Sequence, residues 1–405
     1  MNVPPSKSHT LRAILFAALA KGVSRIEEAL PSPDTQAMIG AVRQLGAEVT
    51  EEGSVLVIRG GKWQVPEDVI QCGNSGIVLR FIGALAGLLP GYTVLTGDAS
   101  IRERRPAKPL IDGLRQLGAF AESAKGNGFA PLIIRGPIKG GRAVIDGEDS
   151  QPVSGLLIAG AFAAAPVELE VRNPGEKPWV DLTLDWLRRL GIPFEREGYE
   201  KYRLQGGACI EGFSYRVPGD FSSAAFPIAA ALITDTEVTL TNLDREDAQG
   251  DKALLGVLQE MGARLIIDEK SITVQKGSRL RGVRVDINGF IDALPILAVL
   301  GCFAEGKTEI VNGAIARKKE SDRIAAMASE LKKMGAQVEE RPDGLVIHSS
   351  TLRSASLESY NDHRIAMSLA VAALRAPSKI AGVECIEKTY PNFWDMLHEF
   401  HSVRV

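Results

Sequence analysis

The hydrophobic positions of this chain form six segments in which almost every residue is apolar, separated by amphipathic segments. A helix without a polar face has to be buried, so these segments predict six buried helices. They cover residues 11–20, 77–89, 153–164, 224–233, 292–302 and 363–374. Each is followed by a turn and a short run rich in β-branched residues, such as 24–27 and 93–95, which predicts a strand.

The amphipathic segments end in nearly the same phrase, a Leu or Met followed by a glycine. These glycines are separated by 72, 73, 71 and 73 residues and are Gly46, Gly118, Gly191, Gly262 and Gly335. Glycine stops a helix because it tolerates the left-handed conformation. Pairs of short alternating strands follow, for example 48–50 with 55–59, and a sixth amphipathic helix is expected at 392–400. The repeating unit is therefore strand, buried helix, strand, exposed helix, strand, strand.

Six such units in 405 residues predict an α/β protein of two similar domains with three units each. We expect the boundary near residues 215–217, which gives domains of 6–216 and 217–405, and residues 1–5 could belong to the second domain. The unit is too long for a solenoid repeat, whose period is usually about 20–50 residues.

Bulk composition excludes several classes of function. A net charge of −3 and a pI near 6.1 argue against nucleic acid or an anionic membrane as the partner. No apolar run approaches the roughly 20 residues that span a bilayer. Four scattered cysteines without a CxxC motif suggest reduced thiols and a cytoplasmic protein, and five histidines without ligand spacing predict no metal site.

The residues just before the buried helices are strongly polar. Ser, Asn and Asp are good helix caps, so each polar group could be a cap and nothing more. Cations nevertheless occur just before or in the first turns of three predicted helices, namely Lys7 with Arg12, Arg80 and Arg364. A cation at a helix N-terminus opposes the macrodipole at a cost of roughly 0.3–1 kcal/mol, which predicts an anionic ligand.

Together, these motifs resemble the 5-enolpyruvylshikimate-3-phosphate synthase (3-phosphoshikimate 1-carboxyvinyltransferase) family along the whole chain. The resemblance rests on Ser6-Lys7-Ser8 with Arg12, Gly73-Asn74-Ser75-Gly76 with Arg80, Arg105-Pro106, Lys319-Glu320-Ser321-Asp322-Arg323, Tyr360-Asn361-Asp362-His363-Arg364 and Lys388-Thr389-Tyr390-Pro391. It implies two domains, each of three βαβαββ repeats forming an inside-out α/β barrel, with the active site between them. It also implies transfer of the enolpyruvyl group of phosphoenolpyruvate to the 5-hydroxyl of shikimate 3-phosphate, without metal or cofactor, by an enzyme that we expect to be a monomer.

The resemblance also assigns residues to the two substrates. For phosphoenolpyruvate it implies Lys7, Asn74, Gly76, Arg105 and Lys388 near the phosphate, and Arg323 and Arg364 at the carboxylate. For shikimate 3-phosphate it implies Ser8 and Arg12 at the carboxylate, and for the rest Asp149, Ser150, Gln151, Asp292 and Lys319.

Two carboxylates are expected to do the proton chemistry. Asp292, at the predicted start of a buried helix, resembles the base of the family, although a plain helix cap is the alternative. Glu320 would be the acid, sharing that role with Lys7 or Lys388. Because buried uncompensated charges are costly, the eight cations at these motifs predict an open, hydrated cleft that closes when the anions bind.

The chain departs from the family at several positions. Asp149 and Glu176 stand where serine is usual, which puts the contacts of the 3-phosphate in doubt. Ile77 stands where threonine is usual, and because glyphosate competes for the phosphoenolpyruvate site in this family, we expect weakened inhibition.

Three other functions compete with this interpretation. The sister transferase acting on UDP-N-acetylglucosamine typically has a cysteine in the loop before Arg105-Pro106, and residues 98–105 contain none. A non-catalytic anion-binding paralogue would not need both Asp292 and Glu320. The stretch 301–308 matches the P-loop pattern, but the repeat places it after a helix and before a strand, the reverse of a nucleotide-binding loop.

Overall fold

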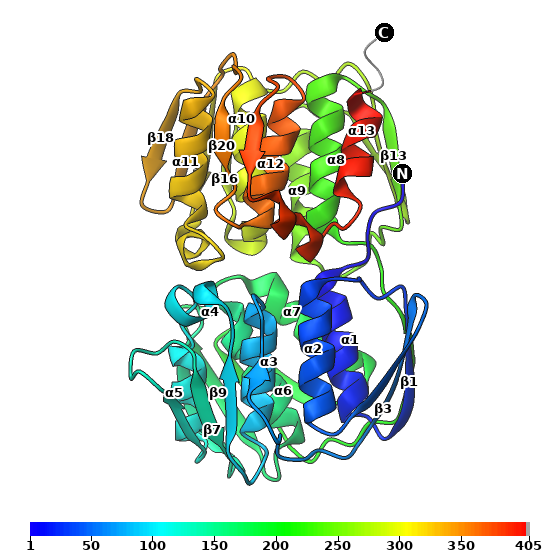
Figure 1. Ribbon diagram of the computed structural model, residues 1–405, viewed down its shortest axis with the longest axis vertical. Coiled ribbons are helices and arrows are strands. Elements are labelled where there is room, and N and C mark those ends of the chain that lie inside the picture. The colour runs from blue at the N-terminus through cyan, green and yellow to red at the C-terminus, as the bar shows by residue number, and fades with distance from the viewer. Residues whose placement is uncertain (402–405) are drawn as a thin grey trace. The chain divides into compact units, whose positions relative to one another are not determined.

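The computed structural model describes residues 1–401, and the chain divides into two compact units (Figure 1). The N-terminal unit is Lys7–Val217, and the C-terminal unit joins Met1–Ser6 to the chain from Pro218 onward.

The N-terminal unit is built from three repeats. The first contains α1 (Lys7–Leu19), β1 (Gly22–Glu27), α2 (Pro33–Gln44), β2 (Glu48–Glu52) and β3 (Val55–Gly60), and β12 (Ser214–Arg216) pairs with β1. The second contains β4 (Ile70–Gln71), α3 (Gly76–Ala86), β5 (Thr93–Thr96), α4 (Ala99–Glu103), α5 (Lys108–Gln116), β6 (Phe120–Ser123) and β7 (Leu132–Arg135). The third contains β8 (Gly141–Asp146), α6 (Ser150–Phe162), β9 (Val167–Arg172), α7 (Lys177–Arg189), β10 (Phe194–Glu197) and β11 (Lys201–Leu204).

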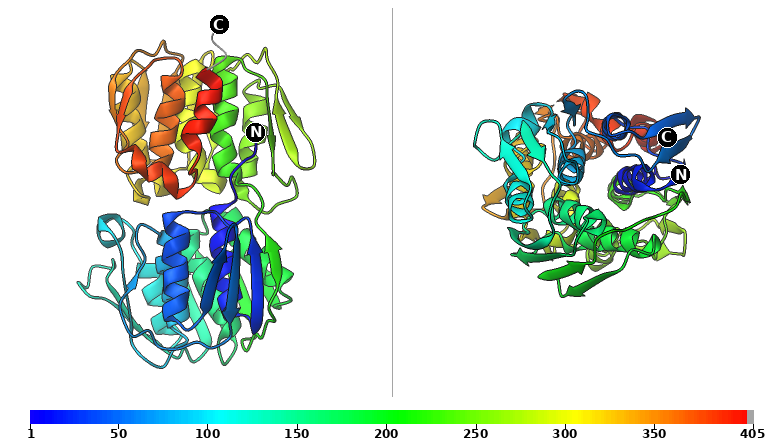
Figure 2. Two further views of the ribbon diagram at one scale, coloured as in Figure 1. Left: turned by 45° about the vertical axis from the view of Figure 1, so that its right-hand side comes forward. Right: turned by 90° about the horizontal axis from the view of Figure 1, so that it is seen from below.

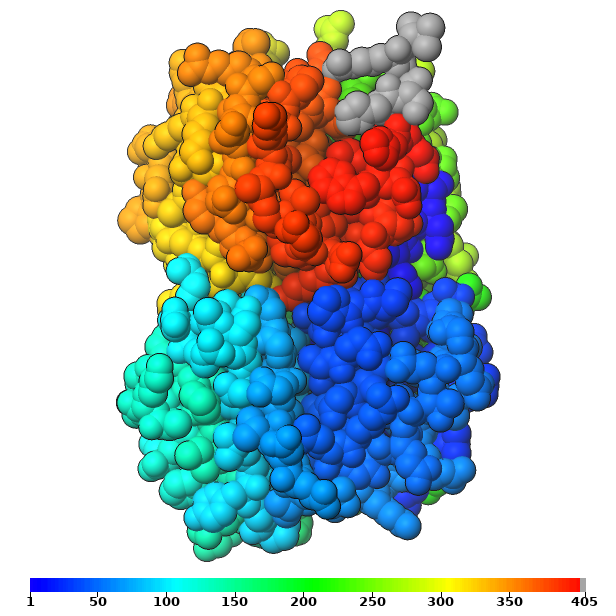
Figure 3. Space-filling view, viewed as in Figure 1, coloured from blue at the N-terminus to red at the C-terminus, as the bar shows by residue number. Residues whose placement is uncertain are grey.

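The C-terminal unit follows the same plan. Its first repeat contains α8 (Phe221–Thr234), β13 (Val238–Thr241), η1 (Gly250–Lys252), α9 (Ala253–Glu260), β14 (Leu265–Ile267) and β15 (Ser271–Val274). The second contains β16 (Arg284–Asp286), η2 (Asn288–Ala293), α10 (Leu294–Phe303), β17 (Lys307–Val311), η3 (Ala314–Lys318), α11 (Arg323–Lys333), β18 (Val338–Arg341) and β19 (Gly344–His348). The third contains β20 (Ser356–Glu358), α12 (His363–Ala373), β21 (Lys379–Ala381), η4 (Val383–Lys388) and α13 (Phe393–His401), whose red surface covers part of the face of this unit in Figure 3.

The sheets repeat one strand order. In β4-β5-β7-β6, β8-β9-β11-β10, β16-β17-β19-β18 and β12-β1-β3-β2, the first two strands are parallel and the others antiparallel. The remaining sheets, β13-β15-β14 and β20-β21, are shorter versions. In Figure 2 the buried helices of each unit stand side by side inside, with the sheets outside them.

The strands of a unit do not close into one continuous barrel, because exposed helices separate neighbouring sheets. The helix α2 packs against β4, and α5 packs against β8, which are the first strands of the next sheets in the chain. Each unit is therefore a ring of alternating helices and small sheets around a core of apolar helices.

One strand position in each unit is filled from a distant part of the chain. The strand β12 pairs in parallel with β1, some 190 residues earlier, and belongs to the N-terminal unit. Asn2 bridges in parallel to Thr241, so the first residues of the chain complete the sheet of β13 in the C-terminal unit.

The predicted helix stops are confirmed by the backbone. Gly46, Gly118, Gly191, Gly262 and Gly335 have φ of 104°, 91°, 69°, 100° and 88°, all in the left-handed region. The P-loop-like stretch begins within α10 and ends in β17, so its context is helix before strand.

Several predicted helix starts are displaced. The helices α1, α6 and α8 begin at Lys7, Ser150 and Phe221, three or four residues before the predicted starts. The predicted start at Asp292 is wrong, because Asp292 lies within η2, whose path is interrupted at Phe290 (φ −148°, ψ 54°). The α-helix begins at Leu294, after Ala293, which makes no side-chain cap. Among the described residues, no helix is long and apolar enough to cross a membrane.

Candidate active site

In the N-terminal unit, Lys7 is the first residue of α1, and a carboxylate from α2 approaches it. The Lys7 Nζ lies 3.6 Å from Oδ2 of Asp34, which is 3% exposed. The same oxygen accepts a hydrogen bond from Ser75 Oγ, the cap of α3 (3.1 Å). Asp34 therefore connects the N-termini of three helices.

Asn74 and Arg105 meet beside this point. Arg105 Nη1 donates to the Asn74 carbonyl (3.2 Å), and Nη2 donates to Asn74 Oδ1 (3.3 Å). Asn74 Nδ2 in turn donates to Asp98 Oδ2 (2.6 Å), and Asp98 caps α4 by accepting from the Ile101 amide. Burial of Asp98 opposes its ionisation, but the hydrogen bonds from Ser100, Ile101 and Asn74 and the charge of Arg105 outweigh it and lower the pKa of Asp98.

Gly76 lies where three polar side chains converge. A Cβ at this glycine would be 2.8 Å from Arg80 Nη1 and 3.0 Å from both Arg105 Nη1 and Gln151 Oε1. Arg80 donates to Gln151 Oε1 (3.3 Å) and forms an ion pair with Asp149 Oδ2 (3.2 Å). The second and third repeats thus present Gly76, Arg80, Arg105 and Gln151 together. Even a methyl group at Gly76 would therefore collide with these polar side chains.

The two unusual carboxylates both have structural partners. Asp149 caps α6 by accepting from the Gln151 amide (2.9 Å). Glu176, 2% exposed and with φ of 45°, accepts from the amide and hydroxyl of Ser150 (3.2 and 3.3 Å). The Ser150 hydroxyl therefore already donates to a carboxylate.

Arg12 is a buried cation whose hydrogen-bond partners are all uncharged. Its guanidinium donates to Thr183 Oγ1 (2.9 and 3.1 Å), the Trp179 carbonyl (3.2 Å) and the Ser8 carbonyl (3.2 Å). It lies 5.0 Å from the ring centre of Phe81, and its burial lowers the pKa of the guanidinium to about 9. A carboxylate ligand would compensate the charge of Arg12 for the water that it loses on burial.

In the C-terminal unit, Arg323 is surrounded by three carboxylates. Nε and Nη2 donate to Asp362 (2.8 and 3.3 Å), Nη1 to Asp292 Oδ1 (2.6 Å), and Nη2 also to Glu320 Oε2 (3.0 Å). Although burial works against the charge, these carboxylates raise the pKa of Arg323 well above its usual value. All three nitrogens of this guanidinium are engaged.

Arg364 differs from Arg323 because it keeps unused donors. It is 2% exposed, and Nη2 donates to Ser222 Oγ (2.6 Å) and Asp292 Oδ2 (3.2 Å). Within residues 1–401, Nε and Nη1 are buried and have no hydrogen-bond partner. Buried N–H groups are normally satisfied, so this arginine presents two donors suited to an anion.

Lys388 and Glu320 form a further ion pair in this cluster, with Lys388 Nζ 2.8 Å from Glu320 Oε1. Lys319, half-buried, follows η3 directly before Glu320. The cations Arg323, Arg364 and Lys388 are thus matched by Asp292, Glu320 and Asp362, and the cluster is formally neutral. The sequence predicts eight cations at these motifs, and the carboxylates within each unit offset part of their charge.

Sequence reasoning missed four residues that hold the site together: Asp34, Asp98, Asp362 and Ser222. Asp362 caps α12 through the Arg364 amide, and it also accepts from Arg323 and from Ser321 Oγ (2.9 Å). These pairings join different repeats, so nothing in the local pattern distinguishes such carboxylates from ordinary caps. Among the described residues, no group of three His, Cys, Asp or Glu side chains could hold a metal ion.

Comparisons with known proteins match this chain over nearly its whole length. A family profile described as EPSP synthase (3-phosphoshikimate 1-carboxyvinyltransferase) matches residues 1–397. The 3-phosphoshikimate 1-carboxyvinyltransferase of Acetivibrio thermocellus is 44% identical over 401 residues, covering 98% of this chain and 94% of its own. That of Chlamydia muridarum is 45% identical over 409 residues, covering 99% and 92%.

Solved structures confirm the predicted fold. The EPSP synthase of Acinetobacter baumannii superposes with a TM-score of 0.81 at 28% identity, covering 98% of this chain and 94% of that one. The enolpyruvyl transferase NikO of Streptomyces tendae, at 20% identity, covers 99% and 94% with a TM-score of 0.78 and shares the fold.

Proposed function

This chain belongs to the EPSP synthase family and catalyses 3-phosphoshikimate 1-carboxyvinyl transfer, and we propose how its own residues perform that reaction. The observation that carries the proposal is Arg364, a buried guanidinium with two unpartnered N–H donors that also contacts Asp292. An anion-binding group and a candidate base are thereby held together.

Phosphoenolpyruvate is bound through both of its acidic groups. Arg364 receives the carboxylate on Nε and Nη1, and Arg323 fixes Arg364's neighbour Asp292 and adds positive potential. Lys7, Arg105 and Lys388 bind the phosphate, with the Asn74 side-chain amide and Gly76 beside it.

Shikimate 3-phosphate binds through charged and uncharged polar residues. Arg12 and Ser8 take its carboxylate, because Arg12 is a buried cation that, among residues 1–401, donates only to uncharged groups. Ser150, Gln151, Lys319 and the Asp149 region contact the remainder. Since Asp149 and Glu176 are already engaged by Arg80 and Ser150, their charge is partly compensated where the 3-phosphate approaches.

The reaction proceeds by addition and elimination. Asp292 accepts the proton of the 5-hydroxyl as its oxygen attacks C2 of phosphoenolpyruvate, and a proton is delivered to C3, giving a tetrahedral ketal phosphate. Glu320, hydrogen-bonded to Lys388, is the proton donor, with Lys7 or Lys388 as the alternative donors. Loss of a proton from C3 and cleavage of the C2–O bond to phosphate then give the product and inorganic phosphate.

Phosphate release tests the proposal. The chain should release phosphate from phosphoenolpyruvate with shikimate 3-phosphate and not with UDP-N-acetylglucosamine. Asp292→Asn should lower kcat at least about 100-fold while phosphoenolpyruvate still binds. A rate unchanged by this substitution would remove Asp292 as the base, and release with the UDP-sugar would favour the sister activity.

The partners are small anionic molecules, and we also propose a monomer located in the cytoplasm. A mass of 43.5 kDa for the purified chain in light scattering would support the monomer, and a stable dimer would contradict it.

A further inference from the structure

The C-terminal unit contains a cavity that the proposed reaction does not use. It has a volume of about 380 Å³ and lies between the loop after β13, the helix α9 and the hairpin β14–β15. Its apolar part is formed by residues that are 8% exposed or less, namely Phe221, Leu243, Leu255 and Ile272. This volume falls in the range of small-molecule sites, which is roughly 300–1,000 Å³.

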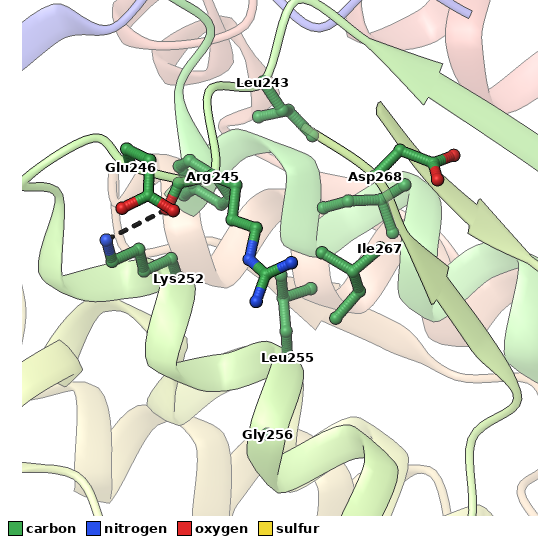
Figure 4. A pocket seen from close by; sticks show the side chains of 10 residues that line it. Leu243, Arg245, Glu246, Lys252, Leu255, Gly256, Ile267 and Asp268 are labelled. Carbon is green, nitrogen blue, oxygen red and sulfur yellow. Dashed lines mark hydrogen bonds between the residues drawn. The ribbon is translucent and has the colours of Figure 1, made fainter. Parts of the chain in front are cut away.

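The mouth of the cavity carries one cation that is available to a ligand. Arg245 makes no side-chain hydrogen bond or ion pair within the described part of the chain, and Figure 4 shows its guanidinium extending over the cavity towards Leu255 and Ile267. Lys252 is different, because its Nζ donates to the Arg245 carbonyl (3.1 Å) and to the Asp247 carbonyl.

The charges select the class of ligand. A guanidinium over an apolar floor suits a carboxylate attached to an apolar body. Glu246 and Asp268 also line the mouth, so a phosphate dianion would be repelled. The best match is a small organic monocarboxylate whose aromatic or branched body fills the apolar part.

This cavity is connected to Arg364 by a short path. Phe221, which lines it, is the first residue of α8, and its amide donates to Gln249 Oε1 (3.0 Å) while Gln249 Nε2 donates to the Gly219 carbonyl (2.9 Å). The next residue, Ser222, accepts from Arg364 Nη2. A ligand against Phe221 would therefore hold the first turn of α8 in the arrangement that positions Arg364.

We propose that this cavity is an effector site for small apolar monocarboxylates, and that its occupation strengthens phosphoenolpyruvate binding at Arg364. The binding of the effector stands on the cavity alone, whereas the coupling rests on the role proposed above for Arg364. Because coupling between two ligands is reciprocal, phosphoenolpyruvate must tighten effector binding by the same factor.

Calorimetry on the full chain tests the binding. The probes are 3-phenylpropionate, 4-methylpentanoate, the uncharged 3-phenylpropionamide and inorganic phosphate. One of the two carboxylates should bind saturably and at least about tenfold more tightly than the amide, a factor of ten being about 1.4 kcal/mol. Arg245→Gln should remove this preference, and Arg279→Gln, at another exposed arginine of the same unit, should not. Absence of saturable binding by either carboxylate, or equal binding to the Arg245→Gln chain, overturns the site.

Phosphoenolpyruvate affinity, measured by calorimetry without turnover, tests the coupling. Saturating carboxylate should lower its Kd about fivefold in the unmodified chain and leave it unchanged in Arg245→Gln. An unchanged or weakened affinity overturns the coupling. Neither measurement needs catalysis. An inactive protein would therefore contradict the proposed function, while effector binding and the change in phosphoenolpyruvate affinity could still be measured.

Discussion

At the scale of single residues, the two arginines of the C-terminal cluster have different surroundings despite similar burial. Arg323 donates to three carboxylates, whereas Arg364 has one carboxylate partner and two unused donors. Lysine keeps the charge of either residue but loses the planar set of donors. The same substitution should therefore have different consequences at the two positions.

For Arg323→Lys we expect mainly a loss of stability, about 3 kcal/mol, because buried carboxylates lose their partner. For Arg364→Lys we expect mainly weaker binding, with the KM for phosphoenolpyruvate raised about tenfold. Denaturant unfolding and steady-state kinetics on both variants measure the two effects. The distinction fails if Arg364→Lys is the less stable protein and binds phosphoenolpyruvate normally.

Asp98 provides a test that depends on pH. Its pKa is lowered in the folded chain, so the ionised carboxylate contributes stability that is present above the unfolded value of about 3.9 and lost as the pH falls through the lower folded value. Asp98→Asn should cost about 1 kcal/mol at pH 7, since Asn74 Nδ2 then faces an amide, and the difference should shrink below about pH 4. Asp112→Asn, which breaks only an exposed pair with Lys108, is the control. A difference that does not change with pH would contradict this assignment.

Ile77 is the second residue of α3, directly after Gly76, and is half-buried. Glyphosate should inhibit the unmodified chain more weakly than the Ile77→Thr variant, because the larger side chain restricts the space where that inhibitor competes with phosphoenolpyruvate. Equal inhibition constants for the two proteins would show that Ile77 does not weaken inhibition by glyphosate.

At the scale of elements, the loop between β20 and α12 is held in shape by a buried carboxylate from α11. Glu330 is 0% exposed and accepts from Tyr360 Oη (2.7 Å), the Glu358 amide (3.0 Å) and Lys333 Nζ (2.8 Å). The loop needs this support, because Tyr360 and Asn361 have φ of 56° and 53°, which non-glycine residues rarely adopt. Asp362 and Arg364 follow immediately.

Glu330→Gln should therefore reduce both stability and substrate binding. An amide cannot accept all of these donors, so we expect a loss of about 2 kcal/mol in unfolding free energy. The KM for phosphoenolpyruvate should rise more than kcat falls, and hydrogen exchange at 358–362 should be faster. Glu339→Gln, at an exposed glutamate of β18, is the control. Normal exchange in this loop would show that Glu330 does not hold it.

Elements were predictable where local pattern decides them. The apolar run at 363–374 becomes α12, all but its last residue buried, and the glycine stops lie where the 72-residue period puts them. Local pattern fails at Asp292, which lies in a 3₁₀ segment interrupted at Phe290. It also fails at Glu330, because a glutamate on an amphipathic helix is ordinarily read as solvent-facing.

The roles of the site residues rest on a different kind of signal and stay predictions. The motifs point to particular cations, since cations at helix N-termini need an explanation. They did not predict that Asp34 would hold Lys7 or that Asp362 would hold Arg323, because each pair joins different helices that are distant in the sequence. Such contacts exist only once the helices are packed together.

At the scale of the whole molecule, the N-terminal unit is one continuous piece of chain, whereas the C-terminal unit is not. The chain passes between the two units twice, at residues 6–7 and 217–218. The first residues complete a sheet of the C-terminal unit, while β12, just before α8, completes a sheet of the N-terminal unit. A fragment that starts at Pro218 would lack a strand position, and one that ends before Ser214 would lack another.

Val3 tests this dependence at a single side chain. It is 0% exposed, packs in the core of the C-terminal unit, and its amide donates to the Thr241 carbonyl (3.2 Å). Val3→Ala should lower the unfolding free energy by about 1–2 kcal/mol through loss of packing, and should speed hydrogen exchange in β13 while β1 remains unchanged. Val23→Ala, at a valine of β1 that is 41% exposed, should have little effect on either. If Val3→Ala instead accelerated exchange in the N-terminal unit, the first residues would be supporting that unit, and the division of the chain at residues 6–7 would have to be redrawn.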